Sequence, residues 1–361
     1  MPETLDRLLS ESRDRLKAAG IENAAVDARH LISGLLGLSL AGLMARGGEP
    51  VGPEDATRIR AAIDRRVARE PVYRILGERE FHGLTLTLSK ETLEPRPDTE
   101  TLVDGLIPHV RRIAAGKGHC RLIDLGTGTG AICLALLAGV LEARGTGTDI
   151  SEDALATARE NAKRNGLAER FQTLKSDWFE AVEGRFDVIV SNPPYIRSTV
   201  IGELEPEVRY HDPAAALDGG NDGLDAYRAI AQHAGRHLEA DGVVGLEIGF
   251  DQKQAVTALF QARGFRLLES RKDLGGNDRV LIFGQDVKGS TTVEKMLHSR
   301  PLFWMSKERA WNPGGSGLVS GRALGRRSWT RDSFQYDLAT GIALKKELLG
   351  FDSALCGYLL I

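Results

Sequence analysis

The sequence predicts an α/β protein in which a small helical bundle precedes a doubly wound, mainly parallel sheet. Strand and helix patterns alternate from residue 120 to residue 284, as expected for a sheet with helices on both faces. Apolar residues recur at helical spacing from residue 1 to about residue 75, and a glycine-rich loop joins a predicted strand to a predicted helix. With 361 residues, the chain is long enough for two domains.

The first expected domain is a helical bundle over residues 1–78. Apolar residues, mainly leucines, recur at helical spacing in two successive stretches and indicate two helices. A third helix is expected from Pro53 through Ala68. Residues 79–92 change to a strand period around Gly83, so we expect a hairpin that links the domains. Asp98 is expected to cap the helix that follows.

The second expected domain spans residues 93–285 and contains the sheet. Seven strands are expected, at 120–124, 144–149, 171–174, 186–191, 243–248, 265–270 and 279–284. Helices are expected at 130–139, 152–165, 223–239 and 251–263. Ligands of such folds bind at the carboxyl ends of the strands, which is where the motifs below occur.

Composition and charge exclude several classes of protein. The net charge is −3, and the first eighty residues carry 13 Lys/Arg and 13 Asp/Glu, so no strongly basic face for nucleic acid is indicated. The cysteines Cys120, Cys133 and Cys356 are scattered, which argues against a disulfide framework and against a metal site. No apolar run is long enough for a membrane span or resembles a signal peptide, so we expect a cytoplasmic protein. We also expect it to be a monomer.

The glycine-rich loop consists of Gly126, Thr127, Gly128, Thr129 and Gly130, between the first strand of the sheet and its helix. Glycines allow the backbone to turn sharply and to approach a ligand closely. By itself the loop fits nicotinamide, flavin or S-adenosylmethionine equally well.

Two later motifs narrow the choice of cofactor. Asp149 ends the second strand about twenty residues after the loop, where a carboxylate accepts both ribose hydroxyls. Its alternative role, as a helix cap, suits Ser151 better. After the third strand, Asp177 could accept an adenine amino group and Trp178 could cover the base, although Trp178 could instead be a core aromatic. This set favours a nucleoside cofactor without a pyrophosphate.

The chemistry is indicated by Asn192-Pro193-Pro194-Tyr195 at the end of the fourth strand. An amide nitrogen is a poor nucleophile because its lone pair is delocalised. The Asn192 side-chain oxygen and the Pro193 carbonyl oxygen can each accept one N–H, which orients the nitrogen and stabilises developing positive charge. Prolines stiffen the loop, and Tyr195 can pack against a planar amide. The alternative is a rigid turn without chemistry.

Taken together, these motifs resemble the release factor glutamine methyltransferase family, often called PrmC or HemK. The resemblance covers residues 5–284 and includes Pro95–Glu100, Asp124–Gly130 and Leu246–Gly249. It implies a seven-stranded class I methyltransferase fold, Rossmann-like, with an antiparallel last strand. It also implies transfer of a methyl group from S-adenosyl-L-methionine to the side-chain amide nitrogen of the glutamine in the Gly-Gly-Gln motif of class I peptide chain release factors, with the N-terminal domain helping to dock the factor.

The resemblance also implies roles for individual residues. The cofactor would be held by Gly126, Thr127, Gly128, Thr129, Gly130 and Asp149, with Trp178 over its adenine. Asn192 would contact both cofactor and glutamine, and Pro193, Pro194 and Tyr195 would shape the glutamine pocket. Arg96 and Glu100 match the family segment near the site, or form a capped helix start with an exposed ion pair. Glu247 either contacts the substrate or supports the site. No metal is required.

Three other functions compete with this hypothesis. An adenine or cytosine amino methyltransferase of DNA or RNA uses a similar Asn-Pro-Pro-Tyr motif but needs a basic target-reading region. A binding protein that kept the fold without catalysis is disfavoured by the intact motifs, and a nicotinamide oxidoreductase is more distant. Residues 286–361 depart from the family pattern and are expected to be an extension of unknown role.

Overall fold

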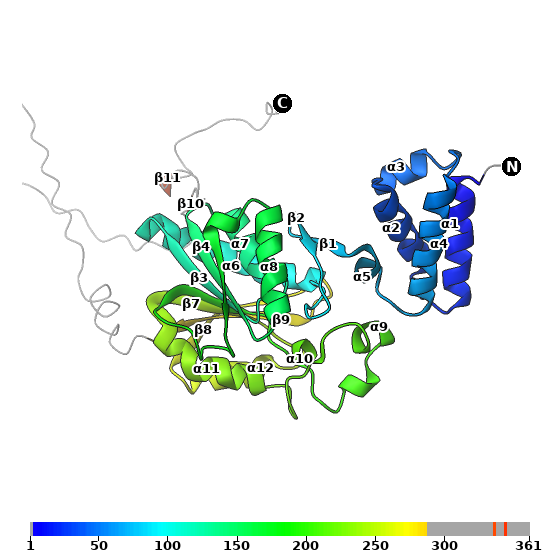
Figure 1. Ribbon diagram of the computed structural model, residues 1–361. Helices are drawn as coiled ribbons and strands as arrows, with labels where there is room; N and C mark the ends of the chain where they lie inside the picture. The colour runs from blue at the N-terminus through cyan, green and yellow to red at the C-terminus, as the bar shows by residue number, and fades with distance from the viewer. Residues whose placement is uncertain (1–2, 287–334, 337–342, 345–361) are drawn as a thin grey trace, which may run out of the picture. The chain divides into compact units, whose positions relative to one another are not determined.

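The computed structural model describes residues 3–286 and two short strands further on, β10 (Gln335–Tyr336) and β11 (Ala343–Leu344) (Figure 1). These two strands pair antiparallel and belong to a separate unit of the chain. The remainder of the predicted extension, residues 287–334, 337–342 and 345–361, lies outside the described residues.

The N-terminal region contains five helices around a core of its own: α1 (Leu5–Ala18), α2 (Ala24–Leu36), α3 (Leu40–Ala45), α4 (Pro53–Val67) and α5 (Val72–Leu76). The predicted third helix is confirmed as α4, with proline in its first turn, where the missing N–H costs no hydrogen bond. The sequence missed α3 and α5, which have only 6 and 5 residues. Such short helices carry too few apolar repeats to be recognised.

A hairpin follows, made of β1 (Glu78–Phe81) and β2 (Leu84–Thr87), as predicted around Gly83. The buried Asn161 of the helix α8 (Glu152–Arg164) holds this hairpin in place. Its Oδ1 accepts the Thr87 N–H at 2.7 Å, and its Nδ2 donates to the carbonyl oxygens of Thr87 at 3.1 Å and Thr129 at 2.9 Å. One side chain therefore connects the linker hairpin to the glycine-rich loop.

The predicted seven-stranded sheet is confirmed, with the order β5-β4-β3-β6-β7-β9-β8. All neighbouring pairs are parallel except those of β9, which runs antiparallel to both β7 and β8. The antiparallel last strand is thus also confirmed. The strands are β3 (Cys120–Leu125), β4 (Ala143–Asp149), β5 (Phe171–Lys175), β6 (Phe186–Ser191), β7 (Leu238–Glu247), β8 (Phe265–Lys272) and β9 (Asp278–Gln285).

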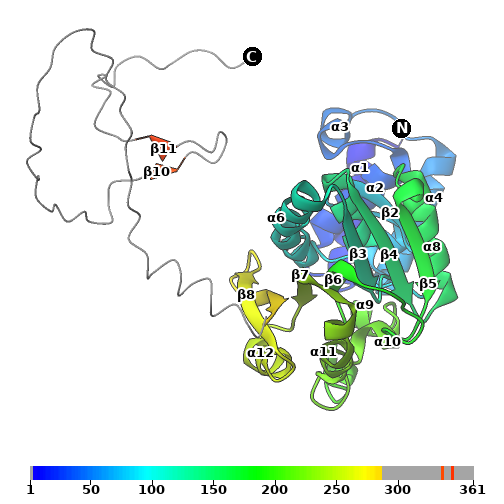
Figure 2. The ribbon, with the colours of Figure 1, turned by 90° about the vertical axis from the view of Figure 1, so that its left-hand side faces the viewer.

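Helices cover both faces of the sheet (Figure 2). Successive residues of β3 show why: Leu122 packs into the core on one face and Ile123 into the core on the other, so the strand carries apolar side chains on both faces. The first core includes residues of α6 (Glu100–Lys117), α7 (Ala131–Gly139) and α8 (Glu152–Arg164). The second includes residues of α11 (Asp225–His237) and α12 (Lys253–Gln261).

The predicted cap at Asp98 is wrong. Pro97 begins a short 3₁₀ turn, η1 (Pro97–Thr99), so that Asp98 is already inside the turn and Thr99 precedes α6 with helical dihedral angles. No side chain caps α6, and Asp98 instead faces Arg279 at 3.8 Å. The carboxylate is therefore used in a tertiary contact that the local sequence does not reveal.

Short elements connect β6 to α11, in a stretch where the sequence predicted none: η3 (Ile201–Glu203), α9 (Pro206–Arg209) and α10 (Ala214–Leu217). A further turn, η2 (Ala168–Arg170), precedes β5. None of the helices in the described part of the chain has the length and apolar character that a membrane span requires.

Candidate active site

A cavity lies at the carboxyl ends of β3, β4 and β6, the edge of the sheet that the sequence indicated. It brings together the glycine-rich loop, the end of β4, the segment after β5 and the turn after β6. Two further segments complete its walls: residues 91–99, which include part of the segment that the family resemblance placed near the site, and residues 213–216, which no sequence motif indicated. Residues lining the cavity from these segments are Glu91, Leu93, Pro95, Arg96, Thr99, Pro213, Ala215 and Ala216.

The glycine-rich loop reverses the chain through left-handed backbone conformations that side chains disfavour. Gly128 has φ +52°, and a Cβ built on it meets no atom within 4 Å. Gly130 has φ +84°, but a Cβ there would lie 3.0 Å from Leu134 in the helix core. Gly128 therefore keeps space open at the cavity, whereas Gly130 allows the loop to pack against α7.

Asp124 supports this loop from beneath. Its Oδ2 accepts the Thr127 hydroxyl at 2.8 Å and the Cys133 N–H at 3.4 Å, while Oδ1 has no partner among the described residues. Burial raises the pKa of Asp124 to about 7, against those two hydrogen bonds, and the nearby Asp149 charge raises it further.

Asp149 lies where a ribose acceptor was predicted, at the end of β4 on the cavity wall. Its Oδ2 accepts the Gly128 N–H and its Oδ1 accepts the Ser151 N–H, both at 3.0 Å. Ser151, not Asp149, caps α8 by accepting the Ala154 N–H at 3.2 Å. The carboxylate is therefore held against the loop and faces the cavity.

Trp178 also lines the cavity, together with Ser176 and Asp177. Its φ of +45° is unusual for a tryptophan, and the Ser176 hydroxyl stabilises this conformation by donating to the Trp178 carbonyl oxygen at 3.0 Å. The ring is half-buried against the second core. The structure thus gives Trp178 a place in both the core and the cavity wall.

Asn192 also lines the cavity and is fixed by a side chain from outside its own motif. Its Nδ2 donates to the hydroxyl oxygen of Thr99 at 3.3 Å. With Nδ2 engaged, Oδ1 is the amide atom available to accept a hydrogen bond from a ligand. The preceding Ser191 donates to the Leu125 carbonyl oxygen at 2.7 Å, which ties the end of β6 to the end of β3.

Of the other residues in the Asn192–Tyr195 motif, one lines the cavity and two pack inside the protein. Pro194 lines the cavity, whereas Pro193 is buried and Tyr195 does not appear among the lining residues. The Tyr195 ring packs on the second core, and its hydroxyl lies 3.3 Å from Oε1 of Glu247. Burial, followed by the Glu247 charge, raises the pKa of Tyr195 well above its ordinary value. In this structure Tyr195 supports the turn rather than facing the open space.

The segment before α6 contributes Arg96 to the cavity. Arg96 donates to Oδ2 of the buried Asp212 at 2.9 Å, and Arg74 of α5 donates to Oδ1 of the same carboxylate at 2.9 Å. Asp212 thereby anchors the residues that follow it, which line the cavity. Glu100 does not line the cavity. Its carboxylate instead accepts the His82 N–H of the hairpin at 2.9 Å.

Glu247 lies at the end of β7 and is only 1% exposed, but it does not line the cavity. Burial raises its pKa to about 7, opposed by the Thr99 hydroxyl, the Arg279 charge and the Tyr195 hydroxyl. Oε2 has no hydrogen-bond partner among the described residues. The geometry favours the supporting role for Glu247 over direct contact.

Two protein-family patterns match the chain, one in the helical N-terminal region and one in the region of the sheet. The family pattern described as "PrmC N-terminal domain" matches residues 7–77, and that of the "Methyltransferase small domain" matches residues 104–203. A release factor glutamine methyltransferase of Agrobacterium fabrum is 58% identical over 280 residues, which cover 78% of this chain and 97% of the relative. The chain belongs to the release factor glutamine methyltransferase family.

A second relative agrees with this assignment. The release factor glutamine methyltransferase of Rhodospirillum rubrum is 46% identical over 278 residues, covering 77% of this chain and 84% of the relative. Among solved structures, the ribosomal protein L11 methylase of Lactobacillus delbrueckii subsp. bulgaricus has a TM-score of 0.40 at 20% identity, covering 56% of this chain and 93% of that one.

Several residues of the site escaped sequence reasoning. Thr99 lies within the recognised family segment, but nothing local links it to Asn192. Asp212 follows a stretch without a predicted element, and its arginine partners are 116 and 138 residues away in the chain. Gln252, whose Nε2 donates to the Tyr195 carbonyl oxygen at 3.0 Å, falls in the first turn of the helix predicted at 251–263 and reads as an ordinary helix residue. Only the folded chain shows these contacts.

Proposed function

We propose that this protein transfers the methyl group of S-adenosyl-L-methionine to the side-chain amide nitrogen of the glutamine in the Gly-Gly-Gln motif of class I peptide chain release factors. One observation carries the proposal. In a member of the release factor glutamine methyltransferase family, the glycine-rich loop and Asn192 line the same cavity. A cofactor held by the loop would therefore lie beside the side chain proposed to orient the amide.

The residues of the cavity fit S-adenosylmethionine better than a dinucleotide. Three carboxylates, Glu91, Asp149 and Asp177, and one guanidinium, that of Arg96, line it within the described part of the chain. This balance suits a cofactor with an ammonium and a sulfonium and disfavours a pyrophosphate. We propose that Asp149 accepts the ribose hydroxyls and that Trp178 covers the adenine.

The same argument gives roles for the loop. Gly126, Thr127, Gly128, Thr129 and Gly130 would allow the cofactor to approach the backbone at the open face of Gly128. The bound sulfonium supplies an activated methyl group. The Asp124 carboxyl does not line the cavity, so its part is to hold Thr127 and the start of α7.

In the reaction, the amide nitrogen of the substrate forms a bond to the methyl carbon while the carbon–sulfur bond breaks and its electron pair passes to sulfur. The nitrogen then loses one proton to solvent. Asn192 Oδ1 would accept one N–H of the amide, and the Pro193 carbonyl oxygen the other. Two fixed acceptors orient the nitrogen and stabilise its developing charge.

We further propose that the N-terminal bundle, within residues 1–78, helps to dock the release factor. The hairpin of residues 79–92 and the catalytic region of residues 93–285 complete the functional enzyme, which we expect to act as a monomer. Ion pairs join the bundle to the catalytic region, because Arg66 and Arg69 of the bundle pair with Glu207 of the catalytic region at 2.9 and 3.4 Å.

A transfer assay with labelled S-adenosylmethionine tests the proposal. The acceptors are a purified class I release factor, the same factor with its loop glutamine changed to alanine, and single-stranded and duplex DNA. We expect label on the intact factor only. Label on DNA would instead support the base-modifying function, and label on the alanine variant would place the methyl group on another residue.

A further inference from the structure

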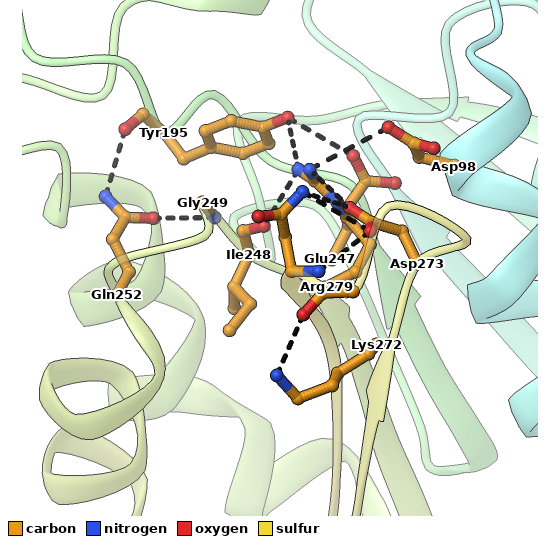
Figure 3. Close-up of polar contacts among 11 residues, drawn as sticks. Asp98, Tyr195, Glu247, Ile248, Gly249, Gln252, Lys272, Asp273 and Arg279 are labelled. Atoms are coloured by element: carbon orange, nitrogen blue, oxygen red, sulfur yellow. Dashed lines mark hydrogen bonds and ion pairs between the residues drawn. The ribbon is translucent and has the colours of Figure 1, made fainter.

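Tyr195 is held at its backbone by a buried glutamine. Nε2 of Gln252 donates to the carbonyl oxygen of Tyr195 at 3.0 Å (Figure 3). The same nitrogen donates to the carbonyl oxygen of Gly223 at 3.1 Å. Oε1 of Gln252 accepts the Gly249 N–H at 3.0 Å and lies 3.4 Å from the hydroxyl of Tyr227. Gln252 is 5% exposed, so both its oxygen and its nitrogen are fully used inside the protein.

The other end of Tyr195 is also held. Its hydroxyl lies 3.3 Å from Oε1 of Glu247 and 3.5 Å from Nη1 of Arg279, so it can donate to the carboxylate and accept from the guanidinium (Figure 3). Arg279 is fixed in turn by Asp273 at 2.9 Å and by the Ile248 carbonyl oxygen at 3.3 Å. The hydroxyl therefore meets groups that are themselves immobilised.

The shape of the turn makes these contacts relevant to the site. Two prolines with restricted φ separate Tyr195 from Asn192, so a shift at Tyr195 is transmitted along a stiff segment. The other end of the turn is anchored through Ser191 to Leu125. The backbone of the turn also packs closely on its neighbours, because a Cβ on Gly223 would lie 2.5 Å from the Tyr195 carbonyl oxygen.

None of Gln252, Glu247 and Arg279 lines the cavity in the described part of the chain. They therefore act on the site through Tyr195. We propose that these residues form a clamp on Tyr195, with Gln252 on its carbonyl and Glu247 and Arg279 on its hydroxyl, that holds Asn192 in position for methyl transfer. The inference rests on the proposed function and assigns three positioning residues to it.

Steady-state kinetics with S-adenosylmethionine and a class I release factor test the clamp. In Gln252→Met and Arg279→Lys, we expect kcat to fall by about tenfold to a hundredfold because a misplaced acceptor costs rate more than binding. The KM for the release factor and the Kd for S-adenosylmethionine should stay within about threefold. Glu247→Gln keeps an oxygen that accepts from Tyr195, so it should retain most of kcat.

Gln285→Met provides the matched control. Gln285 is a half-buried glutamine at the far end of β9 that also donates to a carbonyl oxygen, that of Gly235 at 2.8 Å. Its loss should leave kcat unchanged. Unchanged kcat in both folded clamp variants would overturn the proposal, as would an equal loss in the Gln285 variant, which would indicate general destabilisation.

Hydrogen exchange separates this proposal from the proposed function, because it requires no substrate. In Gln252→Met, amides of residues 190–200 should exchange faster than in the wild type, and they should not do so in Gln285→Met. If the wild type fails to methylate the release factor, the proposed function fails, while faster exchange would still support the clamp. Unaltered exchange in Gln252→Met and Arg279→Lys would refute it. Should Gln252→Met not fold, Arg279→Lys carries both measurements.

Discussion

The two walls of the cavity are built in different ways. The glycine-rich loop is shaped by nearby residues: Gly128 and Gly130 supply left-handed conformations, and Asp124 bonds to Thr127 within the same strand-loop-helix unit. The Asn192–Tyr195 turn is held by residues far along the chain, since Thr99 precedes it by 93 positions and Gln252 follows Tyr195 by 57. The loop proposed to hold the cofactor is thus shaped locally, whereas the orientation of the Asn192 amide depends on tertiary contacts.

The largest effect should come from the turn itself. Replacement Asn192→Ala removes the proposed acceptor, and we expect kcat to fall at least about a hundredfold, the size associated with loss of one preorganised transition-state contact. The melting temperature should change little because Asn192 is only partly buried. The control is Asn165→Ala, which makes the same replacement at an asparagine that does not line the cavity. A near-normal kcat in Asn192→Ala would show that Asn192 takes no part in the chemical step.

The glycine-rich loop should respond in binding rather than in rate. In Gly128→Ala the new methyl group enters the open space of the cavity, and we expect the Kd for S-adenosylmethionine to rise about tenfold, with left-handed strain of about 1–2 kcal/mol. Gly166→Ala introduces similar strain at φ +70°, also with no atom within 4 Å, but away from the cavity. Calorimetric titration should show weaker binding only for Gly128→Ala. Equal Kd values for both variants would show that the loop does not bind S-adenosylmethionine.

A smaller effect is expected where the turn meets the segment before α6. Thr99→Val keeps the shape of the side chain but removes the acceptor for Asn192 Nδ2, so the amide is free to rotate. Loss of one hydrogen bond of about 1 kcal/mol corresponds to about a fivefold decrease in kcat. Thr99→Ser should restore the rate. If serine and valine behave alike in kinetic assays, the hydroxyl does not orient Asn192.

A separate effect concerns stability and its dependence on pH, without a change in the chemistry of the site. The pKa of Asp124 rises from 3.8 to about 7 and that of Glu247 from 4.5 to about 7, mainly because both are buried. The folded chain then binds these protons more tightly than the unfolded chain. The stabilisation is complete below pH of about 4 and is lost as the pH rises through about 7.

Replacement Asp124→Asn tests this dependence. Between pH 5.5 and pH 8 the wild type should lose stability on the order of 2 kcal/mol through Asp124, a few degrees in melting temperature, and the variant should lose less. Thermal unfolding at the two pH values measures the difference. A variant with the same pH dependence as the wild type would show that Asp124 titrates normally.

Much of the fold was predictable because the signals are local. Seven strands and the main helices follow from apolar periodicity, since each central strand is buried on both faces, as Leu122 and Ile123 illustrate. The helix predicted at 223–239 ends at His237, and β7 begins at Leu238, because no loop separates the two elements. Short elements such as α5 and α10 carry too little pattern to be predicted.

The sequence by itself determined the parts whose geometry depends on the residue and its immediate neighbours. These are the glycine-rich loop, Asp149 at a strand end, and the stiff Asn192–Tyr195 turn. Only the tertiary structure decided that Asp98 pairs with Arg279 instead of capping α6, and that Tyr195 points into a buried network instead of the cavity. Such contacts join strands and loops brought together by the sheet order, and no local pattern encodes which distant side chain will meet which.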